Sequence, residues 1–201
     1  MRVKNDLFYF TLIENFVTKE ECDHLISLTD NNLKRAQIGN QYESRVSDSR
    51  TNSVCWVDRH YDNIVYKLCH RISEAVEIPF THTEKLQLLK YEKGQEYKPH
   101  YDACEIDSEG AVKTIAGWGQ RLKTALLYLN DVTSGGETFF PKCGIKIPPK
   151  QGRLLIFNNI DLEHPEFPLF ESLHGSCPVE EGTKWACNLW FRQNKSSLRK
   201  T

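Results

Sequence analysis

The 201-residue sequence contains no hydrophobic run longer than five residues, and Met1 to Asp6 lead into no apolar segment of signal-peptide type. We therefore expect a soluble, cytoplasmic protein that does not enter membranes. An excess of charge of one sign is also missing, because 26 Lys and Arg face 27 Asp and Glu for a net charge of -1. This balance argues against binding to polyanions, so no nucleic-acid partner is expected.

Paired cysteines are missing as well. The seven Cys are odd in number and form no C-x-x-C pair, which disfavours both a disulfide framework and a cysteine zinc site. Internal repeats, low-complexity segments and linkers are absent from the sequence, so we expect a single domain over residues 1–201 with a basic tail at 194–201.

Two segments in the first part of the chain have helical periodicity. Thr18 and Glu21 form a capping box ahead of apolar residues at helical spacing, namely Cys22, Leu25, Ile26 and Leu33. A second series follows Asp62 and ends before Pro79; its apolar members are Ile64, Val65, Leu68, Cys69, Ile72 and Val76. Between them, residues 35–57 are rich in Gly, Asn, Ser and Asp, and we interpret them as a mobile, partly ordered loop.

From residue 85 onward the pattern changes to short apolar segments bounded by Gly, Pro, Asn or Asp. The predicted strands are residues 86–91, 122–129, 137–140, 153–157, 169–174 and 184–191. Two helices followed by at least six strands predict an α+β, β-dominant fold, an antiparallel sandwich or jelly roll backed by helices. We expect helical support from residues 1–84 and the jelly-roll core in residues 85–193.

His100 and Asp102 form an H-x-D pair that can chelate one ion, because residues i and i+2 of an extended strand project from the same face. A surface His and Asp beside a turn would give the same short pattern. His174 ends a later predicted strand, and a closed sandwich can bring it opposite the pair. Two His and one carboxylate leave open positions on a metal, as in the facial triad of non-haem Fe(II) oxygenases.

Zinc is the competing metal, since the same three ligands also make a catalytic zinc site that activates water for hydrolysis. Lys184 favours iron, because a hairpin across Gly175, Pro178 and Gly182 returns it to the cavity of His174. A buried ammonium beside iron suits a dicarboxylate that chelates the metal at one end and pairs with Lys184 at the other. The plain alternative is an exposed lysine on an edge strand.

With these residues the sequence resembles the Fe(II)- and 2-oxoglutarate-dependent dioxygenases, specifically the short prolyl 4-hydroxylases of bacteria, algae and viruses. The resemblance covers nearly the whole chain. It is carried by four ordered blocks: Leu88 to Asp102 (LLKYEKGQEYKPHYD), Arg121 to Asn130 (RLKTALLYLN), Gly135 to Pro141 (GGETFFP), and Leu173-His174-Gly175 through Lys184-Trp185.

The resemblance implies a double-stranded β-helix in which His100, Asp102 and His174 bind Fe(II). Lys184 would bind the distal carboxylate of 2-oxoglutarate, assisted by Tyr91 and Thr138. The implied reaction consumes O2, hydroxylates the substrate, and decarboxylates 2-oxoglutarate to succinate and CO2. Ascorbate is the expected reductant.

Three further segments bear on the substrate. Arg50-Thr51-Asn52-Ser53 resembles the family's R-T-S substrate loop, in which Arg50 and Ser53 would contact a peptide. Trp190 resembles a family tryptophan close to the substrate, although an aromatic residue in a strand is also a usual core residue. The acidic part of residues 103–119 either favours a cationic substrate or is simply solvated.

The leading hypothesis is therefore an Fe(II)- and 2-oxoglutarate-dependent dioxygenase that hydroxylates prolyl residues at C4 in peptides or proteins. One alternative is the hydroxylation of a free amino acid or a small natural product. Another is a catalytically silent peptide-binding module that retains the metal.

Overall fold

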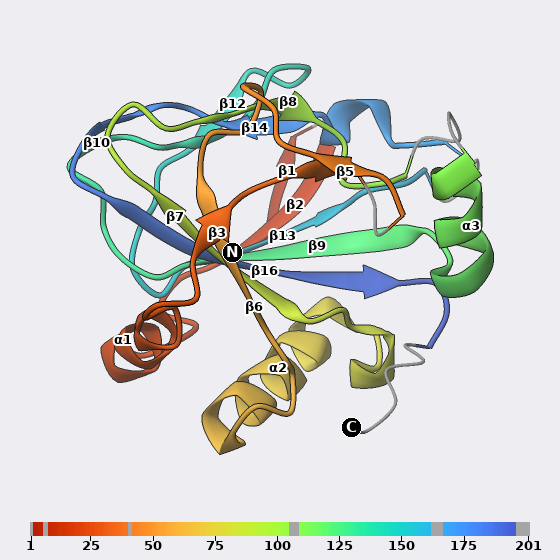
Figure 1. Ribbon diagram of the computed structural model, residues 1–201, viewed down its shortest axis with the longest axis horizontal. Helices are drawn as coiled ribbons and strands as arrows, with labels where there is room; N and C mark the ends of the chain where they lie inside the picture. The colour runs from red at the N-terminus through yellow and green to blue at the C-terminus, as the bar shows by residue number, and fades with distance from the viewer. Residues whose placement is uncertain (1, 6–7, 40–41, 105–108, 162–166, 196–201) are drawn as a thin grey trace.

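The computed structural model describes residues 2–5, 8–39, 42–104, 109–161 and 167–195. Two antiparallel sheets face each other, and the helices α1 (Lys19–Ser27) and α2 (Asn63–Val76) cover the outer face of the larger sheet (Figure 1). The larger sheet has eight strands, in the order β1 (Arg2–Asn5), β2 (Phe8–Ile13), β13 (Leu154–Asn158), β9 (Arg121–Tyr128), β16 (Lys184–Arg192), β7 (Leu86–Tyr91), β6 (Ser53–Val57) and β3 (Lys34–Arg35).

The smaller sheet has four strands, in the order β12 (Ile145–Ile147), β11 (Thr138–Phe140), β14 (His174–Ser176) and β8 (Tyr97–His100). Two short ribbons pair β10 (Ser134–Gly135) with β15 (Val179–Glu181) and β4 (Ile38–Gly39) with β5 (Ser44–Arg45). The helices are α1 (Lys19–Ser27), α2 (Asn63–Val76) and α3 (Glu109–Trp118), with 3-10 turns η1 (Phe80–His82) and η2 (Phe170–Ser172). None of the helices in the described ranges combines the length and apolar composition needed to span a bilayer.

The larger sheet is apolar on both faces because its central strands bury alternate residues on opposite sides. In β9, Leu127 packs toward α1 and α2, whereas Leu126 and Tyr128 pack between the two sheets. In β13, Leu154 likewise packs toward the helices and Leu155 packs between the sheets. Each fully buried side chain of this size contributes about 1.5–3 kcal/mol, so both layers depend on the central strands.

Both predicted helices are confirmed, together with their starts, but Leu33, which the periodicity placed in the first helix, lies beyond the end of α1 at Ser27. Thr18 and Glu21 form the expected reciprocal capping box of α1, and the Asp62 side chain accepts a hydrogen bond from Val65 N at the start of α2. The jelly-roll fold is also confirmed. The prediction of a mobile loop over residues 35–57 is wrong at its end, because β6 pairs with β7 inside the large sheet. The Ser and Asn residues that suggested a loop flank a strand whose Val54, Cys55 and Val57 are buried.

Two other segments differ from the expectation. The sequence 109–118 forms α3, and the predicted strand at residues 169–174 is a 3-10 turn followed by β14. The first 84 residues provide more than helices, since β2 and β6 lie within the large sheet. The division of the chain near residue 84 stays a prediction.

The close approach of β8, β14 and β11 predicts that Gly175→Ala destabilises the fold. A Cβ at this position would lie 2.7 Å from Phe139 Cε1 and 2.7 Å from the Tyr97 carbonyl oxygen. Because the Tyr97 oxygen belongs to the backbone, we expect a loss of about 1–3 kcal/mol in urea-induced unfolding.

Gly117→Ala provides the matched control, because no atom lies within 4 Å of a Cβ there and α3 favours alanine. This variant should gain up to about 1 kcal/mol. Equal stability of the two variants would contradict the steric argument.

Candidate metal centre and active site

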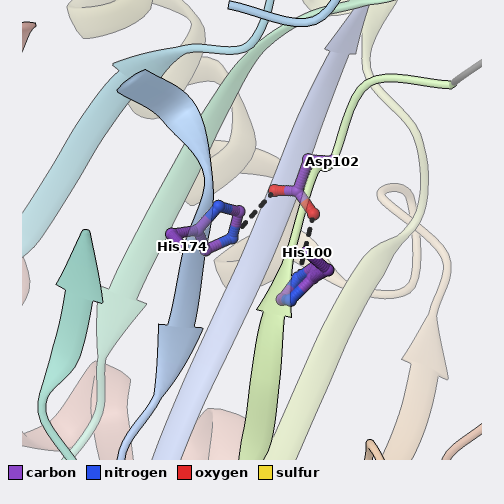
Figure 2. A group of neighbouring side chains, drawn as sticks. All are labelled: His100, Asp102 and His174. Atoms are coloured by element: carbon purple, nitrogen blue, oxygen red, sulfur yellow. Dashed lines mark ion pairs between the residues drawn. The ribbon is translucent and has the colours of Figure 1, made fainter. Parts of the chain in front are cut away.

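The three predicted metal ligands meet between the two sheets. His100 ends β8, Asp102 follows two residues later, and His174 begins β14, where it is paired in register with His100 (Figure 2). The His100 Nε2 atom lies 3.6 Å from Asp102 Oδ1, and His174 Nε2 lies 3.6 Å from Asp102 Oδ2. All three donor atoms lie within 4.8 Å of one another. One ion can therefore contact all three side chains.

The second ring nitrogen of each histidine fixes its orientation. His100 Nδ1 lies 2.9 Å from the Lys98 carbonyl oxygen, and His174 Nδ1 lies 2.8 Å from that of Ser172. A carbonyl can only accept, so Nδ1 of each ring carries the proton and Nε2 presents its lone pair to the metal. Both rings thus have the tautomer that a metal ligand needs.

Asp102 is buried, with 6% of its surface exposed, and its Oδ2 atom accepts two hydrogen bonds. Thr124 Oγ1 donates at 2.6 Å and Trp190 Nε1 donates at 2.9 Å. Burial raises the pKa of Asp102, but the nearby His174, His100 and Arg121 outweigh it and hold the pKa well below its usual range. Asp102 is therefore an anion in a fixed orientation.

Charged residues hold Trp190 in this position. The Arg121 guanidinium lies 3.8 Å from the Trp190 ring centroid and donates to both carboxylate oxygens of Glu84, at 2.7 and 3.0 Å. Arg192 Nε donates to the same carboxylate at 2.6 Å. The pKa of Glu84, which burial raises, is lowered overall by the two guanidinium groups. Two cations thus share one partly buried anion at this end of the site.

Lys184 begins β16 and is 2% exposed, so the alternative of an exposed edge lysine is wrong. Its Nζ donates to Ser176 Oγ at 2.8 Å and lies 5.0 Å from the Tyr91 ring centroid. Among the described residues, Lys184 forms no ion pair with a carboxylate. Burial lowers the pKa of Lys184 to about 7. A buried amine with neutral neighbours is a suitable partner for the carboxylate of a ligand.

The other two residues predicted beside Lys184 lie in the same cleft. Tyr91 is 3% exposed and is paired in register with Lys184, and Thr138 is 2% exposed and paired with Ser176. The Tyr128 hydroxyl donates to Thr138 Oγ1 at 2.7 Å. A polar pocket with Lys184 at its base therefore adjoins the His174 ring.

The cleft has a volume of about 1440 Å³, and it contains the metal-ligand cluster, the Lys184 pocket and Trp190. Arg50, only 8% exposed, also lines it and donates to Asn52 Oδ1, the Gln37 carbonyl oxygen and Gln87 Oε1. Ser53 is half-buried on β6 and is not among the residues that line the cleft. The structure thus brings together all the predicted site residues except Ser53.

Several supporting residues were not predicted. Thr124 is the one polar residue in the buried stretch of β9, and Ser176 follows His174 at the i+2 spacing that places both on one face of a strand. These patterns could have identified them. Of the acidic segment at residues 103–119, Glu105 and Asp107 lie outside the described residues, and Glu109 pairs with Lys113 at 2.6 Å within α3.

Comparison with known proteins agrees with this geometry. Residues 86–192 match the 2OG-Fe(II) oxygenase superfamily. The chain is 38% identical to prolyl 4-hydroxylase 2 of Arabidopsis thaliana, over 89% of this chain and 65% of that protein. It is 35% identical to probable prolyl 4-hydroxylase 6 of the same plant, over 94% of this chain and 70% of that protein. The chain thus spans about two thirds of the length of these relatives.

Among solved structures, the 2OG complex of the viral collagen prolyl hydroxylase of Paramecium bursaria Chlorella virus-1 superposes with a TM-score of 0.72 at 28% identity, covering 93% of this chain and 97% of that one. A prolyl hydroxylase from Trichoplax adhaerens, bound to a peptide fragment of a hypoxia inducible factor, shares the fold at a TM-score of 0.63 and 20% identity, over 91% of this chain and 83% of that one. This chain belongs to the 2OG-Fe(II) oxygenase superfamily. Within it, the chain is similar to the prolyl 4-hydroxylases.

The residues fit the two groups in the superfamily's name. A facial set of two imidazoles and one carboxylate is the donor set of non-haem Fe(II) centres. Lys184, with Thr138 in the same cleft, offers a buried cation of the kind that pairs with a carboxylate such as the second one of 2-oxoglutarate. The competing zinc hydrolase has no use for this buried lysine.

The hydrogen bonds to Asp102 Oδ2 predict that Trp190→Phe and Thr124→Val lower metal affinity by about 10–100-fold, because each leaves the carboxylate less firmly oriented. Anaerobic titration with Fe(II), or with Co(II) followed by its absorption, measures the change. Trp185→Phe is the matched control on the same strand, since Trp185 contacts Lys90 rather than Asp102. Wild-type metal affinity in both test variants would contradict this assignment.

The lowered pKa of Lys184 predicts that 2-oxoglutarate binding weakens above pH 7. Below this pH the ammonium is already present, whereas above it each binding event must take up a proton. The apparent Kd should therefore rise toward about tenfold per pH unit between pH 7 and 8.5. Anaerobic calorimetry of the Mn(II) protein in buffers of different ionisation enthalpy measures both the Kd and the proton uptake.

Lys184→Met is the control for this pH dependence. Its binding should be weak and nearly independent of pH, because the titrating amine is gone. A wild-type Kd that stays constant from pH 6.5 to 8.5 would show that Lys184 does not titrate in this range.

Proposed function

We propose that this chain is an Fe(II)- and 2-oxoglutarate-dependent dioxygenase that hydroxylates prolyl residues of peptides or proteins at C4. The observation that carries this proposal is the convergence of the His100, Asp102 and His174 cluster with the buried Lys184 in a single cleft. The prolyl 4-hydroxylases among the relatives support proline as the target.

In this proposal, His100 and His174 hold Fe(II) through Nε2, and Asp102 holds it through its carboxylate. Lys184 binds the distal carboxylate of 2-oxoglutarate, with Thr138 beside it. When bound, Fe(II) with O2 and 2-oxoglutarate supplies the oxidising power that converts a C–H bond to C–OH and yields succinate and CO2. Ascorbate would act as the reductant that returns oxidised iron to Fe(II).

The side chains around the metal ligands orient and shield the reacting groups. The rings of Phe157 and Phe140 lie 4.8 and 5.7 Å from the His174 ring and exclude water from that side. Trp190 and Thr124 hold Asp102 as an anion with a fixed orientation. The proposed reaction requires no general base, and the protein contributes positioning and electrostatics.

The cleft favours a peptide over a free amino acid. It extends beyond the metal ligands to Arg50, Trp56 and Tyr61, and the last two side chains are 48% and 62% exposed. A site for one free amino acid would need a smaller, closed cavity. The complete set of metal ligands, together with Lys184, argues against a silent peptide-binding module.

The test is anaerobic reconstitution with Fe(II), followed by addition of O2, 2-oxoglutarate and ascorbate, with a proline-rich peptide or the same peptide with Ala in place of Pro. Only the proline peptide should give hydroxyproline, in amounts equal to the succinate formed. His174→Ala should abolish both products because a metal ligand is lost. His60→Ala, an exposed histidine outside the cleft, is the matched control.

Each failure has a separate meaning. Succinate without hydroxyproline, and without stimulation by peptide, would keep the oxygenase and reject proline as the substrate. Absence of succinate despite bound iron would support the silent module instead.

A further inference from the structure

The charge of the cleft differs from the charge of the chain. Among the described residues that line the cleft, eight Lys and Arg face three Asp and Glu, a net charge of +5, whereas the whole chain carries -1. Fe(II) and the dianion of 2-oxoglutarate have opposite charges of equal size, so their binding leaves this excess unchanged. A cleft with walls of low dielectric concentrates such a field.

Part of the excess positive charge belongs to residues that are largely buried in the wall of the cleft. Arg50 is 8% exposed, and its three hydrogen-bond acceptors are the neutral Asn52, Gln37 and Gln87. It forms no ion pair with a described carboxylate. The pair of Arg121 and Arg192 adds a second surplus charge, because the two share the single carboxylate of Glu84. Burying charge without a counter-ion is costly, which favours an anionic ligand for these positions.

The rest of the excess lies on one rim of the cleft. Lys34 and Arg35 of β3 and Lys98 of β8 are exposed lining residues, and none of the three forms an ion pair with an acidic side chain in the described part of the chain.

A single segment joins this rim to Arg50. Arg35 Nη2 donates to the Ser47 carbonyl oxygen at 3.5 Å, and Lys98 N donates to that of Ser49 at 2.8 Å. Arg50 follows directly, and its guanidinium lies 4.6 Å from the Tyr97 ring centroid. Elsewhere in the lining, Lys85 is paired with a carboxylate, since its Nζ lies 3.8 Å from Asp58 Oδ2. Most of the excess therefore comes from four residues that this segment brings together, which we call the cationic rim (Lys34, Arg35, Arg50 and Lys98).

We propose that the peptide substrate is acidic, with Asp or Glu residues flanking the target proline and lying against the cationic rim. This proposal rests on the proposed prolyl hydroxylation and names the chemical class of its substrate. Carboxylate side chains complement exposed Lys and Arg at a spacing that an extended peptide can match. Acidic flanks also raise the rate of encounter, because the field attracts the peptide before contact.

The test compares three peptides that share one central proline and differ only in their flanks, which carry Glu, Gln or Lys at the same positions. At low salt, the KM of the Glu peptide should be about 5–10-fold below that of the Gln peptide, with the Lys peptide poorest. The kcat values should stay similar, because the flanks lie away from the reacting carbon. Since exposed charges are screened within about 3 Å at 1 M salt, the difference should nearly vanish there.

Variants that remove a positive charge show which residues cause the preference for the Glu peptide. Lys34→Gln with Lys98→Gln should reduce the ratio of KM values between the Gln and Glu peptides to about 2 or less, since these charges supply much of the rim. Lys67→Gln is the matched control, because Lys67 is an exposed lysine on α2, on the other side of the large sheet (Figure 1). It should leave the wild-type ratio unchanged.

The possible outcomes distinguish the proposal of an acidic substrate from the proposed prolyl hydroxylation on which it rests. Hydroxylation of all three peptides with equal KM would overturn the acidic substrate and leave prolyl hydroxylation intact. Hydroxylation of none would count against prolyl hydroxylation itself. A single-stranded oligonucleotide that competes more tightly than the Glu peptide would overturn the proposal in favour of a nucleic-acid ligand for the same rim.

Discussion

The buried carboxylate of Asp102 is the constraint on which the rest of this site depends. A carboxylate with 6% exposure is stable only if its charge and its lone pairs are matched. Two imidazoles face it from the smaller sheet, while Thr124 and Trp190 bind it from the larger one. Neither sheet alone can satisfy it, so the metal centre requires the packed sandwich. Trp190 in turn is held in place by Arg121, which contacts its ring and, like Arg192, binds Glu84. The position of the carboxylate therefore also depends on this group of charges.

Register in the smaller sheet is the second condition. His100 and His174 face each other across β8 and β14, and a slip of one residue would turn one ring to the opposite face. Gly175 permits the close approach of these strands, since a Cβ would meet Tyr97 O and the Phe139 ring. Lys184 comes from the larger sheet, where pairing with Tyr91 fixes its position. The ligand pocket is thus formed by residues far apart in sequence that backbone pairing brings together.

The sequence was sufficient for the parts of the molecule that have local signals. Capping residues and periodicity gave both main helices, and the H-x-D pair with His174 and Lys184 gave the centre of the site. Residues 50–57 were misjudged because Ser and Asn are common both in loops and beside short strands. The partners of Asp102 could not be assigned, because Thr124 and Trp190 reach it only through the pairing of β9 with β16. Charge on the cleft was hidden by the near-zero balance of the whole chain.

The cleft therefore has two kinds of positively charged residue, one buried and one exposed, and each suits a different ligand. Lys184 is enclosed by neutral groups and 2% exposed, so its charge is lowered by burial and acts only at contact distance on a carboxylate that enters the pocket. The exposed members of the cationic rim act through water over about a Debye length, weakly at each residue and more strongly together. In the function proposed, the enclosed amine selects a small dianion and the rim selects a long, flexible anion. Because Lys184 is buried and the cationic rim is exposed, the two ligands would bind at different places in the cleft, and neither would displace the other.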